Sequence, residues 1–432
     1  NPRIEGSEVA IGGAVLTLGR RGVPSGLQFT DVRVRGPEGA LLLSAPRLAA
    51  RFHLADLLLG RLQPTRLLLV NAEARVLRSA DGRIRVGLGG SGVRLGGGPG
   101  PGMDAVAKIV DGFVGDSEPP DVLARLDEIG IIGARLAYED AMSGRRWRTA
   151  GSDLVITRTE NGARARMRAA LSESPEATTR LAVEATRAAG TGRTEVRLRF
   201  RDLQADDIAE QAAGAGWVRR LDAPLAGEIR FAVPRAGGVE GLAGRVGFRD
   251  GEVFALEGPA RRIDRARLAF RAAGDGALEI TRLEVAGAAL EAALSGRVAA
   301  GGGDLLAPGR LAVQLDLERL ALDLPQVFEA PLSFDGGQLV ARLDPARGAA
   351  EIGHLHLSRG AMTLAAEGRL RRGEGGPEAA FRVSGRELTV EDLTAHWPLG
   401  AGENARPWVV EHVRRGRIPE MVGHVALGRD AP

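Results

Sequence analysis

The sequence predicts a mostly β protein: an elongated, curved antiparallel sheet built from repeated units, with only a few short helices. Three observations predict this class. Apolar and polar residues alternate with a period of two along most of the 432 residues, as strands require. Only 4% of the residues are aromatic although 44% are hydrophobic, which suits a wide, thin apolar layer better than a thick core. The third observation is an internal repeat.

The first 88 residues predict one amino-terminal β-unit. Within it, residues 27–36 hold two alternating apolar sets that change phase near Asp31, which predicts a bulge or a turn there.

Two hairpin turns are predicted further along the chain. Gly144 follows a Ser and Gly162 follows an Asn, and such pairs favour hairpin turns because Gly tolerates a positive φ.

Residues 89–130 predict a Gly-rich linker followed by two short helices. The linker lacks the Gly-Lys-Ser/Thr end of a phosphate-binding loop, so a flexible connection is the better interpretation. Apolar residues at helical spacing predict the first helix over 103–115, and 121–130 is a second, shorter candidate. Repeated β-units then occupy residues 131–432.

The repeat aligns residues 282–298 with residues 354–370 without gaps, and each copy predicts a hairpin of two strands. Alternation places one apolar set on a single face of each hairpin. This set contains Leu283, Val285, Leu290 and Leu294 in the first copy, and Leu355, Leu357, Met362 and Leu364 in the second. The pattern leaves two possibilities open: a second sheet covers the apolar face, as in a sandwich, or the sheet forms a trough that takes an apolar ligand.

A second element recurs between the hairpins, where a strand is followed by an acidic and an aliphatic residue. The acidic residues are Asp207, Asp323 and Asp392, and their recurrence at unit junctions predicts caps or turns, not catalytic acids. The Trp-rich stretch 393–421 is therefore a third copy of a crossing segment. Its two Trp residues are expected to pack this segment over the edge of the sheet. The alternative is that they close off the apolar trough.

Composition argues against several function classes. The absence of Cys excludes disulfides, Cys-ligated zinc and Cys nucleophiles. His354 and His356 have a spacing that can bind metal, but their repeat partners Arg282 and Glu284 indicate a solvated face. The net charge of +3 and the lack of a basic run interleaved with aromatics do not favour nucleic acid.

Three further absences complete this picture. His396, His412 and His424 have no carboxylate spacing typical of a zinc site, so no metal or cofactor is expected. One Tyr and four scattered Trp argue against a sugar-active enzyme. No stretch approaches the length of a membrane span.

Four stretches resemble a known family, and two of them are "LAYEDAMSGRRW" and "DAPLAGEIRFAV". Residues 40–86, with "AP", "DLLLG" and a following "DG", resemble the amino-terminal unit of the AsmA-like family. The stretch "HWPLGAGENARPWVVEHVRRGRI" resembles the YhdP-type branch of that family, through Trp397-Pro398, Arg406-x-Trp408 and the run from His412 to Ile418.

The resemblance implies a bacterial envelope protein of the periplasm, held in the inner membrane by an amino-terminal helix that this segment lacks. It also implies a β-groove that conducts phospholipid toward the outer membrane, with a possible outer-membrane or periplasmic partner and no catalysis. The eight apolar residues of the repeat would line the groove. Trp397, Arg406, Trp408 and His412 would belong to a crossing segment or lid. The alternative is a structural or assembly factor for outer-membrane proteins, which uses strand edges as templates.

Overall fold

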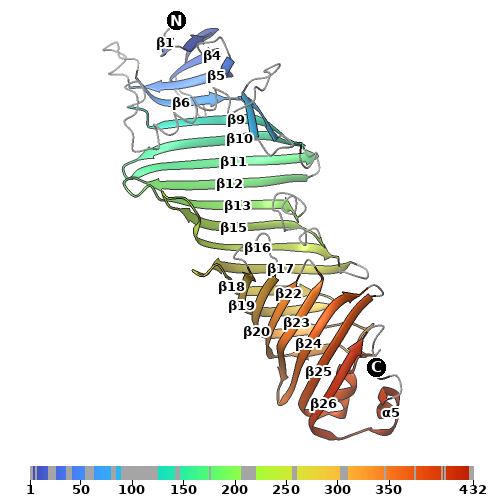
Figure 1. The fold of residues 1–432 in the computed structure, drawn as a ribbon. Coiled ribbons are helices and arrows are strands. Elements are labelled where there is room, and N and C mark those ends of the chain that lie inside the picture. The colour runs from blue at the N-terminus through green and yellow to red at the C-terminus, as the bar shows by residue number, and fades with distance from the viewer. Residues whose placement is uncertain are drawn as a thin grey trace. The chain divides into compact units, whose positions relative to one another are not determined.

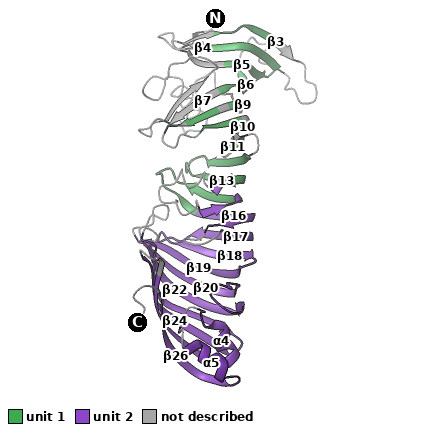
Figure 2. Cartoon of the chain, turned by 90° about the vertical axis from the view of Figure 1, so that its right-hand side faces the viewer, with its two compact units in different colours: residues 1–203, 228–241 green, residues 204–227, 242–432 purple. Residues whose placement is uncertain are grey.

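The computed structural model describes residues 3–4, 7–17, 26–35, 41–53, 63–78, 84–88, 125–141, 146–174, 177–205, 220–254, 260–301, 310–344, 347–373, 376–399, 402 and 405–427. The chain divides into two compact units (Figure 2). Unit 1 contains residues 1–203 and 228–241, and unit 2 contains residues 204–227 and 242–432.

Each unit is an open, curved and mostly antiparallel sheet, so the predicted fold class is confirmed (Figure 1). The described residues hold two short helices, α4 (Val390–His396) and α5 (Ala405–His412). No described strand belongs to a second sheet that packs on the first. Of the two possibilities left by the pattern, the closed sandwich is therefore wrong for the described part of the chain.

Unit 1 is built from strands β1 to β13. Their bounds are β1 (Arg3–Ile4), β2 (Ser7–Ala10), β3 (Gly13–Thr17), β4 (Gly26–Arg35), β5 (Leu41–Phe52), β6 (Pro64–Val70), β7 (Glu73–Arg78), β8 (Ile84–Leu88), β9 (Glu128–Asp140), β10 (Arg146–Thr159), β11 (Gly162–Ser174), β12 (Ala177–Ala188) and β13 (Thr194–Gln204). Three further strands lie where the chain passes between the units: β14 (Leu221–Asp222) belongs to unit 2, β15 (Pro224–Val233) runs from unit 2 into unit 1, and β16 (Glu240–Val253) runs from unit 1 into unit 2.

Unit 2 continues as a series of hairpins. Its further strands are β17 (Arg261–Ala272), β18 (Leu278–Gly287), β19 (Leu290–Gly301), β20 (Arg310–Leu322), β21 (Leu332–Phe334), β22 (Gly336–Asp344), β23 (Ala349–Arg359), β24 (Met362–Gly373), β25 (Gly376–Thr389) and β26 (Arg417–Leu427). From β16 to β20 and from β22 to β26, each strand pairs antiparallel with the next, and β20 pairs with both β21 and β22.

One junction in unit 1 is parallel. β6 and β7 both pair parallel with β9, and the break between them lies at Asn71, which has a φ of 56°. Gly133 of β9 sits opposite this break with a φ of 65°. The two left-handed residues let both strands bend together, so the ladder resumes after the break.

Several local predictions are confirmed. Asp31 has a φ of 52°, and the β4–β5 register passes over it, as the phase change in the sequence predicts. Gly162 has a φ of 137° at the β10–β11 hairpin. The turn at Gly144 and the first predicted helix lie outside the described residues.

The helix predicted over 121–130 is wrong at its carboxyl end, since β9 begins at Glu128. The reason is tertiary: Leu126 is fully buried against Leu67 and Ile129, and β9 takes its hydrogen bonds from β6 and β10. The division at residues 88 and 130 remains a prediction.

The repeat is confirmed down to its irregularities. The β18–β19 hairpin has a register shift between Ile280 and Leu283, and the β23–β24 hairpin has the same shift between Ile352 and Leu355. The two copies therefore share a bulge at the same offset as well as an alternating pattern. A bulge increases local twist, so each repeat bends the sheet at the same point.

Candidate functional site

Backbone pairing brings the apolar side chains of unit 2 into rows that cross the strands. Directly paired residues in an antiparallel sheet point to the same face, and their side chains lie about 5 Å apart. One row contains Leu268, Leu283, Leu294, Leu317, Leu357, Leu364 and Met421, with Gly337 and Gly385 between them. The adjacent row contains Leu315, Leu339, Leu355, Ala366 and Val383.

The eight apolar residues singled out from the repeat all lie on this face. Leu283 and Leu294 are partners in one hairpin, and Leu357 and Leu364 are partners in the other. The other four lie two or four residues along the same strands and so point the same way: Val285, Leu290, Leu355 and Met362.

Unit 1 has rows of the same kind. One row contains Phe29, Leu48, Leu69, Ile131, Leu154, Met167, Val183 and Leu198. These side chains are only partly buried. A row of this length shows that the apolar face is not confined to the repeat found in the sequence.

The opposite face carries ion pairs between neighbouring strands and along single strands. In unit 2, Arg271 binds Glu279 through two hydrogen bonds of 2.7 Å, and Arg282 binds Glu284 at 2.7 Å. The hydrogen bond from Arg271 holds the pKa of Glu279 below its usual value. Such exposed pairs add little to stability, so this face is a solvated charged layer.

The apolar face of unit 2 is covered at one end and open at the other. At the covered end, Leu332, Phe334, Met362 and Leu388 form a cluster that is between 1% and 5% exposed. Toward the other end, Leu315, Leu339 and Leu355 are only partly buried, and Leu370 is 40% exposed. Apolar side chains therefore line a surface that no described element shields.

Two crossing segments contact the buried cluster: Phe328 of residues 323–331 packs against it, and the ring of His396, from residues 390–399, lies beside Phe334. We refer to these two segments together with α5 as the cover (α4 and α5 are labelled in Figure 2). The segments bind each other, because Leu399 donates a backbone hydrogen bond of 2.8 Å to Val327 and Arg406 pairs with Glu329. A further ion pair joins Arg359 of β23 to Asp392 of α4.

Asp392 takes part in capping α4, as the recurrence of acidic residues predicts: it is the N3 residue of a capping box whose N-cap is Thr389. Its carboxylate accepts hydrogen bonds from the backbone N–H and hydroxyl of Thr389, and the Thr389 hydroxyl accepts one from the Asp392 N–H. Burial alone would raise the pKa of Asp392. The Thr389 hydrogen bonds and the Arg359 charge outweigh burial and hold that pKa below its usual value. In the other crossing segment, residues 323–331, Asp323 directly follows β20 and donates its backbone N–H to Ala289. Asp207 lies outside the described residues.

The four predicted residues of the crossing segment have different surroundings. Trp397 is partly buried, and its indole lies beside Gly402. Arg406 is largely buried in its ion pair with Glu329. Trp408 is 57% exposed and stacks on the ring of His412 at 5.1 Å. Of the two Trp, only Trp397 is thus partly enclosed, and Trp408 faces outward.

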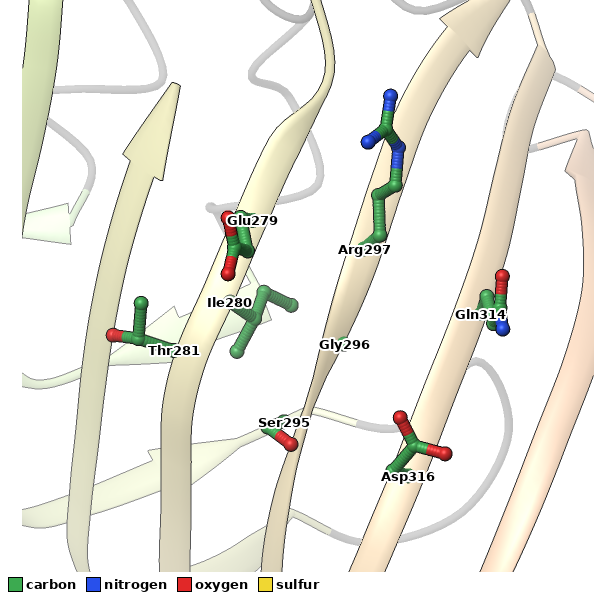
Figure 3. A pocket seen from close by; sticks show the side chains of 8 residues that line it. All are labelled: Glu279, Ile280, Thr281, Ser295, Gly296, Arg297, Gln314 and Asp316. Carbon is green, nitrogen blue, oxygen red and sulfur yellow. The ribbon is translucent and has the colours of Figure 1, made fainter. Parts of the chain in front are cut away.

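A shallow polar depression lies on the charged face of β18, β19 and β20 (Figure 3). Its volume is about 430 Å³, and its rim carries Glu279, Arg297, Gln314 and Asp316. Arg297 pairs with Asp275, and Glu279 pairs with Arg271. The charges of Arg297 and Glu279 in this depression are therefore already neutralised by their partners. The depressed pKa of Glu279 also does not suit a general acid.

The His residues do not assemble into a metal site within the described residues. His354 and His356 stack at 6.4 Å on the charged face, His412 stacks on Trp408, and His424 is exposed on β26. His396 differs from the rest, because it packs on Phe334 beneath the cover.

Comparison with known proteins identifies no relative: no family model, no curated protein and no solved structure matches this chain. Among the described residues, no helix has the length and apolar character needed to cross a membrane.

The sequence pattern missed part of the apolar face. The rows run through β20 and β22, whose residues Leu315, Leu317 and Leu339 alternate as clearly as those of the repeat. Extending the alternation to these strands would have found them. Phe334 and Leu388 gave no such signal, because their burial depends on the crossing segments that fold over them.

Proposed function

We propose that the chain binds the acyl chains of phospholipids on the apolar faces of its sheet and lets them move from strand to strand. The observation that supports this proposal is the set of rows in which apolar side chains follow one another across the strands and, except for the buried Leu294, remain partly exposed. An ordinary sheet buries such a face against a second layer.

The physical argument concerns the barrier to moving a lipid through water. Each CH₂ group moved out of an apolar environment costs about 0.8 kcal/mol, so an acyl chain in free water is strongly disfavoured. Neighbouring strands lie about 4.8 Å apart. A row with an apolar side chain at nearly every strand therefore offers closely spaced sites of similar energy.

The charged face fits the same proposal. Ion pairs such as Arg271–Glu279 and Arg282–Glu284 keep that face hydrated, which leaves the apolar face as the place where a lipid chain is bound. Polar head groups would remain in water beside the open end of that face. Movement along a surface breaks no covalent bond, so the proposal assigns no catalytic residue and no cofactor.

The resemblance to the AsmA-like family extends the proposal to a place in the cell. We propose transport of phospholipid between the inner and outer membranes, with the chain in the periplasm and anchored in the inner membrane. This part rests on that resemblance alone.

The test uses two neighbouring residues of β22 that point to opposite faces. Leu339 lies in an apolar row, whereas Val340 is 44% exposed on the charged face. Leu339→Asp places a charge in the path of the acyl chain, and Val340→Asp places the same charge in the same strand on the other side. Leu364 is a poorer choice, because it packs against the buried cluster and a charge there would disturb folding.

The purified chain and both variants are analysed by native mass spectrometry, with lipid extraction in parallel. We expect phospholipid to co-purify with the wild type and with Val340→Asp, and to be lost from Leu339→Asp while circular dichroism stays unchanged. Equal lipid content in the two folded variants would refute the assignment of the apolar face. A wild type free of lipid would instead favour the assembly-factor hypothesis.

A further inference from the structure

His396 occupies an unusual position at the boundary between the cover and the sheet. It is the last residue of α4, and its ring lies 5.4 Å from the ring of Phe334, one of the most buried residues of unit 2. Met362 and Leu388 belong to the same cluster. The imidazole thus forms part of the surface with which the cover seals this end of the apolar face.

The hydrogen bonds define the protonation state of the ring. Nδ1 lies 2.6 Å from the backbone carbonyl oxygen of Asp392, which can only accept, so Nδ1 carries the proton and donates it. Nε2 is buried and has no hydrogen-bond partner among the described residues. A proton added at Nε2 would therefore create a buried cation with an unsatisfied N–H group.

Two charged groups face His396: Arg359 from β23 and Asp392 from α4 itself. Burial lowers the pKa of His396, the Arg359 charge lowers it further, and the hydrogen bond to the Asp392 carbonyl together with the Asp392 carboxylate oppose this shift only in part. Arg359 and Asp392 also pair with each other, which limits how far the carboxylate can compensate an imidazolium.

We propose that the cover is an acid-opened lid: protonation of His396 releases α4 from Phe334 and exposes the covered end of the apolar face. The lid rests on the proposed lipid function, because it would regulate access to the same face. Its opening is a property of the folded chain that does not require lipid to be present.

The direction of the pH dependence follows from linkage. In the open state the imidazole is solvated and has its ordinary pKa near 6.5, whereas in the closed state its pKa is lower. The open state therefore binds the proton first. The closed state keeps its full stability above about pH 6.5 and loses stability as the pH falls from there toward the depressed pKa. Asp392 stays ionised over this range because its own pKa is depressed.

Hydroxyl-radical footprinting read by mass spectrometry tests the lid, with the oxidation rate of Met362 as the signal. Met362 is 3% exposed beneath the cover, and Met167 of unit 1 serves as an internal reference. Between about pH 7.5 and about pH 5.5 we expect Met362 oxidation to rise about threefold to tenfold relative to Met167, since each unit of pKa difference shifts the equilibrium by up to a factor of ten.

Two variants separate the role of His396 from a general effect of acid. His396→Phe keeps an aromatic ring on Phe334 and cannot titrate, so the rise in Met362 oxidation at low pH should disappear. His396→Gln is also neutral and should give the same result if the Phe variant folds poorly. His412→Phe is the matched control: His412 makes the same contact to the carbonyl four residues earlier, but its side chain is 51% exposed. This control should retain the rise.

An unchanged Met362 signal in the wild type, or an equal rise in both His396 variants, would overturn the proposal. Lipid content is not measured in this experiment. A pH-dependent lid on a chain that never co-purifies with lipid would therefore count against the proposed function alone.

Discussion

Replacing a leucine under the cover should cost far more stability than replacing a leucine at the open end of the same face. Leu388 is 1% exposed, and Leu370 is 40% exposed. Both belong to the apolar face of unit 2, Leu388 beside Ile418 and Leu370 between Ala350 and Ala379. The substitutions Leu388→Ala and Leu370→Ala therefore remove the same atoms from two environments.

The magnitudes follow from burial. Leu388→Ala leaves a cavity among Phe334, Met362 and their neighbours, and buried Leu→Ala changes cost about 2–5 kcal/mol. Leu370 keeps much of its surface in water, so the same change there should cost about 1 kcal/mol or less. The difference reports how completely the cover shields its end of the face.

Hydrogen exchange measured by mass spectrometry on peptides from β24, β25 and α4 is a suitable assay, because it reads local opening free energies in a chain without one global core. We expect protection in β25 to fall by at least about thirtyfold in Leu388→Ala and by less than about sixfold in Leu370→Ala. Similar losses in the two variants would refute the reasoning, since they would mean that the open end is also packed.

Two further predictions concern local geometry. A Cβ at Gly296 or at its repeat partner Gly368 would lie 2.2 Å from a backbone oxygen of the adjacent strand. Either Ala substitution should therefore destabilise its hairpin by about 1–3 kcal/mol. Gly423→Ala is the control: open space surrounds this position, so the melting temperature should stay unchanged. Thr389→Ala removes the N-cap of α4 and should cost about 1 kcal/mol of local stability by hydrogen exchange, whereas Thr394→Ala should have little effect because its hydroxyl is exposed. The difference in α4 protection between the wild type and Thr389→Ala should persist from neutral pH down to about pH 4 and be lost only as the pH falls through the depressed pKa of Asp392. A difference that already shrinks near pH 6 would contradict this assignment.

Much of the candidate site could be predicted from the sequence. The alternation in residues 282–298 and 354–370 placed eight apolar residues on one face, and the register agrees because neighbouring residues in a strand must point to opposite sides. The Asp392 cap was also predictable, since capping depends on residues three positions apart. The helix predicted at 121–130 was wrong at its end because pairing with β6, more than fifty residues earlier, outweighed local propensity.

The sequence by itself determined which side chains share a face, because strand alternation is a local property of the backbone. It did not determine whether that face is open or covered. That was decided by contacts between distant residues, such as Phe334 with His396 and Arg406 with Glu329, which is 77 positions away. Such contacts depend on how the crossing segments return over the sheet, and no period in the sequence specifies that path.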